Sequence, residues 1–308
     1  MEGKKDKRYT IFPIHHPDLW DRYKGAQKQL WIAEEVDLSQ DKWYQLTEKE
    51  KEVLKMCLGF FSASDIIVNN NIVLTVLPKI NEAEAEFYYN LQLFIESVHS
   101  ELYALFIERY IPQGEQLNMF NAATDIPTVK KKTDWAMKWM NTESFEESLV
   151  AFACVEGLAF SVLFSIIFYF KESDKLPGLC NGNLMILKDE QSHYEFGIHY
   201  FKNYTKGLEK DKIREIILSC FETEKQFSID VLGQGLPGLT ISKMIQYVEF
   251  VTDGVLKDFG LEKEFGSSNP LHYMSKIALD SRSNFFESRA TNEYTRAEQS
   301  VDLFDEDF

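Results

Sequence analysis

The sequence predicts an all-α protein whose helices form a bundle around a large apolar core. Helical periodicity dominates the chain, because only eight prolines and fifteen glycines interrupt its 308 residues. No segment shows the alternation of apolar and polar residues that would indicate strands. Hydrophobic residues make up 44% of the chain, with 24 phenylalanines beside 14 tyrosines, and this is enough to bury a large interior.

The pattern predicts eight helices. The first carries Trp31, and the second opens at Thr47 with Glu50 three residues later, which is the signature of a capping box. The third and fifth carry histidines in apolar surroundings, and the fourth contains the richest apolar run, Ala159–Phe170. The last three follow from the same periodicity. In chain order, the expected ranges are 18–33, 47–76, 82–110, 143–170, 184–204, 210–232, 240–259 and 271–286.

The composition argues against two classes of binding partner, nucleic acids and membranes. A formal net charge of −16 and a pI near 4.9 argue against nucleic acid, because phosphate binding needs clustered lysine and arginine. We expect no membrane partner, because the N-terminus has no apolar signal core and Ala159–Phe170 is too short to span a bilayer. The four cysteines are scattered without a CxxC pair, which indicates reduced thiols in a cytoplasmic protein.

Two histidines are each preceded by a glutamate at position i−3. The pairs are Glu96-x-x-His99 and Glu190-x-x-His193. Residues three apart lie on one face of a helix, so each pair can present a carboxylate and an imidazole toward the same point. A single pair of this kind is common on helix surfaces. Two pairs on separate, strongly apolar helices indicate a shared metal site.

Two further acids stand in apolar stretches of other helices. Asp65 follows Leu58–Phe61, and Glu156 lies within Ala151–Phe160. A buried carboxylate is costly unless it is paired or bound to a metal. Single carboxylates from two helices, with Glu-x-x-His from two others, are the ligand pattern of ferritin-like dinuclear proteins. The sequence therefore predicts a ferritin-like helical bundle with two metal ions per chain. Its mixed oxygen and nitrogen donors suit iron or manganese. Two iron ions are expected, with two manganese ions or a mixed pair as the alternatives.

These residues stand in stretches that closely resemble the small subunit of class I ribonucleotide reductase, in its eukaryotic and viral branch. The likeness runs from about Ile11 to the C-terminus. The matching stretches are Phe12–Trp20, Trp31–Ser39, Phe60–Asp65, Glu96–Tyr103 and Lys188–His193. One departure is Lys188, because relatives often carry arginine there. The family's metal ligands fall on Asp65, Glu96, His99, Glu156, Glu190 and His193.

The resemblance implies that Tyr103 bears a stored radical. Helical geometry agrees, because Tyr103 lies four residues after His99 and so faces the metal side. Taken alone, a tyrosine at this position would more often be a plain core residue. The family's unreactive radical pocket falls on Phe160, Phe164 and Ile186, which could at the same time be ordinary core packing.

The resemblance also implies a route for the radical. Asp189 matches the acid that hydrogen-bonds a metal-bound imidazole, here His99. Trp31 matches the next step, and Tyr294 matches the tyrosine that hands the radical to the large subunit. Without the resemblance, Tyr294 would be interpreted as an exposed tail residue.

The chain is expected to divide into a helical domain over residues 1–290 and a flexible tail over residues 291–308. The first ~10 residues are expected to be disordered, and terminal fraying is also the default for the tail. The apolar residues Leu303, Phe304 and Phe308 nevertheless stand out in an acidic segment, which suits docking into a groove of the large subunit. A homodimer of this chain is expected as well.

The implied function is that of the small subunit of class I ribonucleoside-diphosphate reductase. Its metal centre would activate oxygen to generate a tyrosyl radical, which the large subunit would use to reduce ribonucleotides. A ferritin-like ferroxidase is the main alternative, although it has no need of Tyr103, Trp31 or Tyr294. A ligand-binding oxidase is a second alternative, and Asp65 argues against it because a glutamate usually stands there. A metal-free helper subunit should lack the ligands.

Overall fold

Residues 8 and 10–277 are described in the computed structural model of this chain. The chain divides into two compact units, residues 1–270 and residues 271–308. The described part of the second unit is a short helix over residues 272–277, within the predicted helix 271–286. The predicted tail 291–308 and the predicted boundary at residue 290 lie outside the described residues.

The described part of the first unit is helical, with one isolated bridge between Leu236 and Leu239. This confirms the all-α prediction. The α-helices are α1 (Pro17–Gln27), α2 (Glu48–Asn71), α3 (Ala83–Tyr110), α4 (Gln113–Phe120), α5 (Ala122–Asp125), α6 (Pro127–Met140), α7 (Phe145–Cys154), α8 (Phe160–Tyr169), α9 (Pro177–Tyr204), α10 (Lys210–Leu232) and α11 (Ile241–Asp258).

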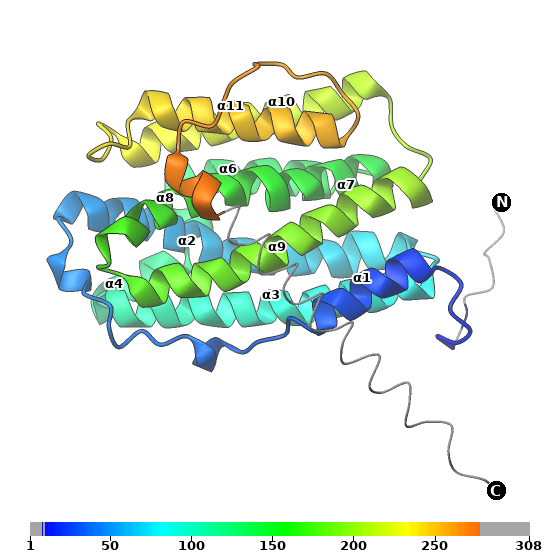
Figure 1. The fold of residues 1–308 in the computed structure, drawn as a ribbon, viewed down its shortest axis with the longest axis horizontal. Coiled ribbons are helices and arrows are strands. Elements are labelled where there is room, and N and C mark those ends of the chain that lie inside the picture. The colour runs from blue at the N-terminus through cyan, green and yellow to red at the C-terminus, as the bar shows by residue number, and fades with distance from the viewer. Residues whose placement is uncertain (1–7, 9, 278–308) are drawn as a thin grey trace, which may run out of the picture. The chain divides into compact units, whose positions relative to one another are not determined.

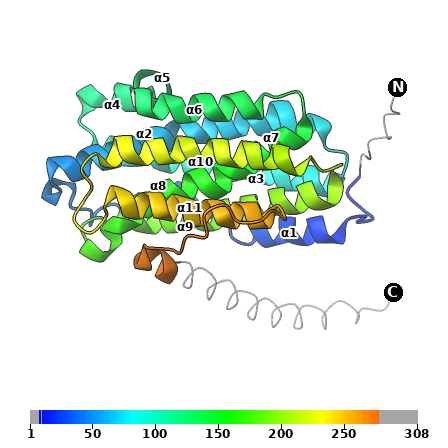
Figure 2. The same ribbon diagram turned by 90° about the horizontal axis from the view of Figure 1, so that it is seen from above.

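Within this unit, α2 packs against α3, and α1 packs along the outer side of α3. Helices α10 and α11 pack against each other, and α10 also contacts α6 and α7 (Figures 1 and 2). Helix α9 crosses between these two groups and contacts both α3 and α7. The bundle interior is therefore bounded by α2, α3, α7–α8 and α9, the four helical stretches that carry the predicted ligands.

Several predicted helix boundaries are confirmed. Thr47 caps α2, because its hydroxyl accepts the backbone N–H of Glu50, and the Glu50 carboxylate accepts the N–H of Thr47 at 2.7 Å. The predicted helix 143–170 is continuous but contains a π-helical turn, Val155–Ala159, between α7 and α8. Such turns are frequent at functional sites, and this one carries Glu156. Gly157 allows a close approach there, because a Cβ would lie 2.5 Å from the ring of Tyr194.

The prediction for the first helix was wrong at its end. Helix α1 stops at Gln27, and Trp31 lies in the connection after it. The stretch 24–29 contains no large apolar residue, so nothing holds a further helical turn against the core. The backbone of Ile32 is extended, with φ −127° and ψ 156°.

Helices α4 to α6 were missed by the sequence analysis. Helix α6 has a regular buried face, but that face includes Lys132. Its ammonium is buried because it pairs with the Glu224 carboxylate at 2.8 Å and lies over the rings of Phe60 and Phe227. Because a lysine stands among the apolar residues of the buried face, the helical pattern of this stretch was not recognised in the sequence.

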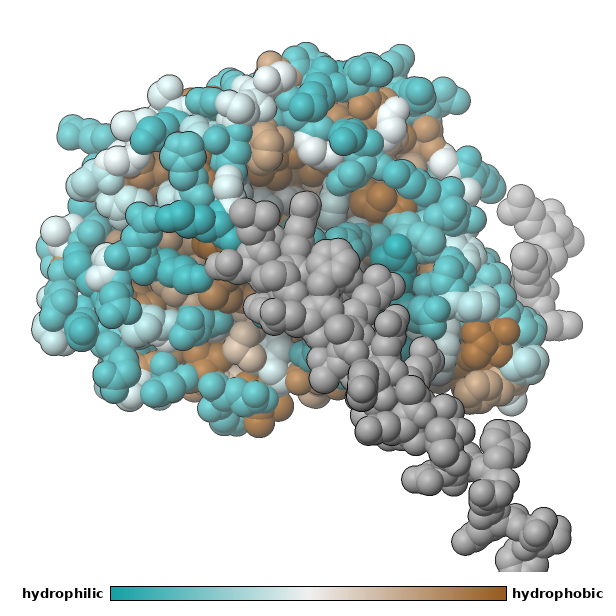
Figure 3. Space-filling model, in the orientation of Figure 1, coloured by the Kyte–Doolittle hydropathy of each residue, from teal (hydrophilic) through white to brown (hydrophobic). Residues whose placement is uncertain are grey.

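Two helical stretches, Glu48–Lys79 and Phe145–Ser173, are long and apolar enough to cross a membrane by length and composition. Within the 18-residue apolar window of each stretch, 53% is buried inside the fold for the first and 89% for the second. Burial of this kind is what core helices show, because their apolar surface is already covered by protein. The face drawn in Figure 3 carries mostly hydrophilic residues among its described side chains.

Candidate metal centre

The six predicted ligands come from four helical stretches that meet in the bundle interior. Asp65 lies on α2, Glu96 and His99 on α3, and Glu156 on the π-helical turn; Glu190 and His193 lie on α9. All six are almost fully buried. Burial of four acids at one place is costly unless positive charge neutralises them.

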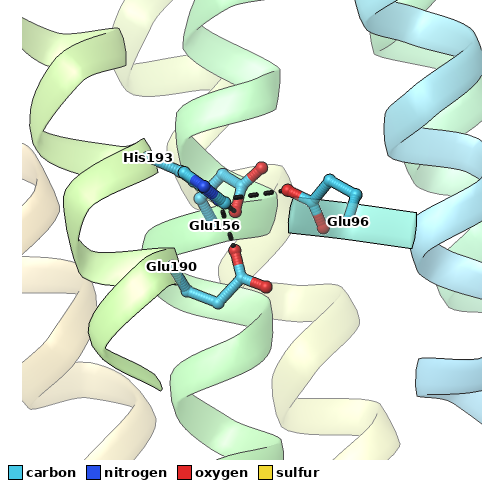
Figure 4. A group of neighbouring side chains, drawn as sticks. All are labelled: Glu96, Glu156, Glu190 and His193. Carbon is cyan, nitrogen blue, oxygen red and sulfur yellow. Dashed lines mark hydrogen bonds and ion pairs between the residues drawn. The ribbon is translucent and has the colours of Figure 1, made fainter. Parts of the chain in front are cut away.

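Four of these residues form a tight group, which Figure 4 shows. Donor atoms of Glu96, Glu156, Glu190 and His193 all lie within 4.8 Å of one another. The Nδ1 atom of His193 lies 3.0 Å from Oε1 of Glu96 and 3.1 Å from Oε2 of Glu190. Oε2 of Glu156 lies 4.0 Å from the same nitrogen, so carboxylates from three helical stretches converge on it.

His99 joins the same group from the side of α3. Its Nδ1 lies 3.0 Å from Oε1 of Glu190 and 3.4 Å from Oε2 of Glu96. Asp65 adjoins the group electrostatically, because the negative charge of Glu96 is a main cause, after burial, of the raised pKa of the Asp65 carboxyl. The structure thus brings five of the six predicted residues into one group by direct contacts, and Asp65 is buried within reach of their charges.

The donors fit a pair of cations. Buried carboxylate oxygens without a hydrogen-bond partner include Asp65 Oδ2, Glu96 Oε2 and Glu156 Oε2. Unpaired buried polar atoms are rare in proteins, and three of them on neighbouring acids are suited to bind cations. Four carboxylates would balance two divalent cations. The buried carboxylate and imidazole cluster therefore indicates a dinuclear metal site.

The pKa shifts have the same physical cause. Burial, followed by the charge of Glu190, raises the pKa of the Glu156 carboxyl well above its ordinary value. Burial alone would lower the pKa of His193, but the charge of Glu96 and a hydrogen bond to Glu190 raise it to about 9. Both pKa values are therefore raised by the same thing, the negative charge of several carboxylates that are buried close together.

Tyr103 lies on α3 in a closed aromatic pocket. Its side chain is fully buried, and its ring stacks on Phe61 with 4.5 Å between centroids and 6° between planes. Phe61 in turn contacts Phe160 at 5.5 Å and Phe164 at 5.3 Å between ring centroids. Two of the predicted pocket residues, Phe160 and Phe164, thus adjoin Phe61, which lies against Tyr103 and which the sequence analysis did not single out, while Ile186 is buried on α9.

The phenol of Tyr103 is hydrogen-bonded and protonated. Its hydroxyl donates to Oδ1 of Asn183 at 3.0 Å, and the Asn183 amide donates to the Leu179 carbonyl at 2.8 Å. Burial, followed by the nearby charge of Asp65, raises the pKa of Tyr103 well above its ordinary value of 10.0. Loss of an electron from this phenol must therefore be accompanied by loss of its proton.

A continuous polar contact leads from His99 to the loop after α1. The indole N–H of Trp31 donates to Oδ2 of Asp189 at 2.7 Å, and Nε2 of His99 lies 3.1 Å from the same oxygen. The Trp31 ring also stacks on the His99 imidazole, with 5.8 Å between centroids. These three residues are in the order that the resemblance implied. Tyr294, Leu303, Phe304 and Phe308 lie outside the described residues.

Comparison with known proteins identifies the family of this chain. Residues 8–270 match the family model described as "Ribonucleotide reductase, small chain". The chain belongs to the ribonucleotide reductase small-chain family. A small chain from Plasmodium falciparum is 42% identical, over 94% of this chain and 84% of the relative. The small chain of Variola virus is 38% identical, over 93% and 91%.

Solved structures place the fold in the same family. The Rnr4 homodimer of Saccharomyces cerevisiae, described as a ribonucleotide reductase, superposes with a TM-score of 0.78 at 27% identity. The match covers 87% of this chain and 86% of that chain. The ferritin-like bundle and the function as a class I ribonucleoside-diphosphate reductase small subunit, both expected from the sequence, are confirmed by these relatives.

Proposed function

We propose that this small chain holds two metal ions on Asp65, Glu96, His99, Glu156, Glu190 and His193, and stores a radical on Tyr103 for a large reductase subunit. The observation that carries the proposal is the position of the fully buried Tyr103 one helical turn after His99, beside a group of unpaired carboxylate oxygens. When bound, the metal pair supplies the oxygen activation that oxidises the phenol. Iron is the first choice, and manganese accepts the same donors.

The protein's own contribution is to keep the oxidised phenol from reacting. The rings of Phe61, Phe160 and Phe164, with the buried Ile186, would exclude water and offer no O–H, N–H or S–H group from which a radical readily abstracts a hydrogen atom. Asn183 fixes the orientation of the phenol oxygen through its hydrogen bond. A dry, rigid pocket of this kind lengthens the lifetime of a radical because potential reductants cannot reach it.

Metal analysis and electron paramagnetic resonance of the protein from its native source test this proposal directly. We expect about two iron or manganese ions per chain and a tyrosyl signal after exposure to oxygen. Protein that binds fewer than one metal ion per chain under saturating conditions would contradict the ligand assignment.

The C-terminal tail is proposed to dock on the large subunit. Leu303, Phe304 and Phe308 are apolar residues in an acidic segment, and docking would place Tyr294 between the subunits. Deletion of residues 300–308 should leave metals and radical intact but abolish association and turnover with the large subunit. Tyr294→Phe should differ, because the subunits should associate without passing the radical. Normal nucleotide reduction by the truncated chain would rule out docking through the tail.

We also propose that this chain forms a homodimer, as the yeast relative is described to do. Large apolar side chains are exposed on α2, on the turn that follows it and on α3: Ile66, Val73, Leu74, Phe87 and Phe94. Exposed apolar surface of this extent marks an interaction site. The combined change Leu74→Glu and Phe94→Glu should shift the mass in sedimentation from dimer to monomer. Leu117→Glu on α4, equally exposed, serves as the control and should remain dimeric.

A further inference from the structure

Gln92 is a buried glutamine one helical turn before Glu96 on α3, and it is not among the predicted ligands. Its side-chain Nε2 donates to Oε1 of Glu96 at 3.1 Å and to Oε1 of Glu156 at 3.2 Å. The two acids belong to α3 and to the π-helical turn, so this one amide links two helical stretches of the candidate metal centre.

The orientation of this amide is fixed by charge. A side-chain amide offers two N–H donors on nitrogen and two lone pairs on oxygen. Rotation by 180° would place Oε1 of Gln92 against two carboxylate oxygens, which would repel it. Both N–H groups therefore point at Glu96 and Glu156, and Oε1 of Gln92 is left without a hydrogen-bond partner. In this orientation both carboxylates receive a hydrogen bond, and the unpaired atom is the amide oxygen of Gln92.

The consequence concerns the two carboxylate groups themselves. On both Glu96 and Glu156, the oxygen that Gln92 engages is Oε1, while Oε2 has no hydrogen-bond partner. A carboxylate can bind a metal through one oxygen or through both. An amide that occupies one oxygen of each acid favours binding through the other. Gln92 is also neutral, so it orients two acids without adding to the negative charge of the group.

We infer that Gln92 is a positioning residue that selects which oxygen of Glu96 and of Glu156 is presented to the metal pair. This inference rests on the proposed dinuclear centre. Groups that orient metal ligands in this way typically change metal affinity by about 10- to 100-fold when they are removed. Both acids would lose their orientation together, so removal of this one amide should weaken binding more than loss of a contact to a single acid.

Gln92→Met is the sharpest test, because methionine keeps the length and volume of the side chain but has no N–H donor. In an anaerobic calorimetric titration with Fe(II), the variant should bind at least one of the two ions about 10- to 100-fold more weakly than the unaltered protein does. Near-infrared circular dichroism of the Fe(II) form should also change, since those bands report coordination geometry. Gln92→Asn keeps the amide but is one methylene shorter, so it should fail in the same way.

Thr252→Val on α11 is the matched control. It removes a fully buried hydrogen bond, from the Thr252 hydroxyl to the Val248 carbonyl at 2.7 Å, on a helix that carries none of the six predicted ligands. Its Fe(II) affinities and circular dichroism should match those of the unaltered protein. If Gln92→Met and Gln92→Asn bind both ions with unchanged affinity and spectrum, the inference is overturned. If the unaltered protein itself binds fewer than two ions, the proposed centre has failed instead.

Discussion

Replacement of Tyr103 by phenylalanine is expected to abolish the tyrosyl radical and nucleotide reduction while both metals remain bound. The phenylalanine ring can keep the stacking on Phe61, so the pocket should retain its shape. Only the hydroxyl and its hydrogen bond to Asn183 are lost. The unpaired Asn183 oxygen should lower stability by about 1–3 kcal/mol, which a thermal unfolding curve can detect.

Electron paramagnetic resonance beside metal analysis would measure this outcome. Tyr110→Phe is the matched control, because Tyr110 is also buried on α3 and donates its hydroxyl to Asp41. We expect that control to keep the radical signal. An unchanged spectrum in Tyr103→Phe would remove Tyr103 as the radical site. Retained activity without a tyrosyl signal would instead place the oxidising equivalent on the metals.

The candidate ligands could be picked out from the sequence because their spacing follows helix geometry. Glu96 and His99, like Glu190 and His193, are three residues apart on one helix. Polar residues at this spacing are easily noticed when most of their neighbours in the helix are apolar. The helical core follows for the same reason. What a single helix presents on one face can be seen in one stretch of sequence.

Contacts between distant segments were not predictable in this way. Helix α9 begins at Pro177, before the predicted residue 184, because Asp41 accepts the backbone N–H groups of Gly178 and Leu179 at 2.7 and 3.0 Å. A capping carboxylate more than a hundred residues away leaves no local signal. Asn183 and Gln92 were missed for a related reason, because a neutral amide in a helix is ordinary until its partners are known.

Loss of the Trp31–Asp189 contact is expected to stop turnover without removing the stored radical. Asp189 accepts from the Trp31 indole and adjoins Nε2 of His99 through the same oxygen, Oδ2. This oxygen therefore links the candidate centre to the Trp31 indole by hydrogen bonds, in addition to the stacking of the Trp31 ring on His99. Trp31→Phe keeps an aromatic ring beside His99 but removes the indole N–H. Asp189→Ala removes the shared oxygen altogether.

When saturated with metal, both variants should show a Tyr103 signal, yet nucleotide reduction with the large subunit should fall by more than about 100-fold. Asp189→Asn separates charge from geometry, because its amide oxygen can still accept both contacts while the negative charge is gone. Partial activity in Asp189→Asn would show that position matters more than charge. Trp135→Phe is the control, since that indole donates to Ser219 at 2.9 Å on α10 and should leave turnover unchanged. Normal turnover in Trp31→Phe would mean that the radical leaves Tyr103 by another path.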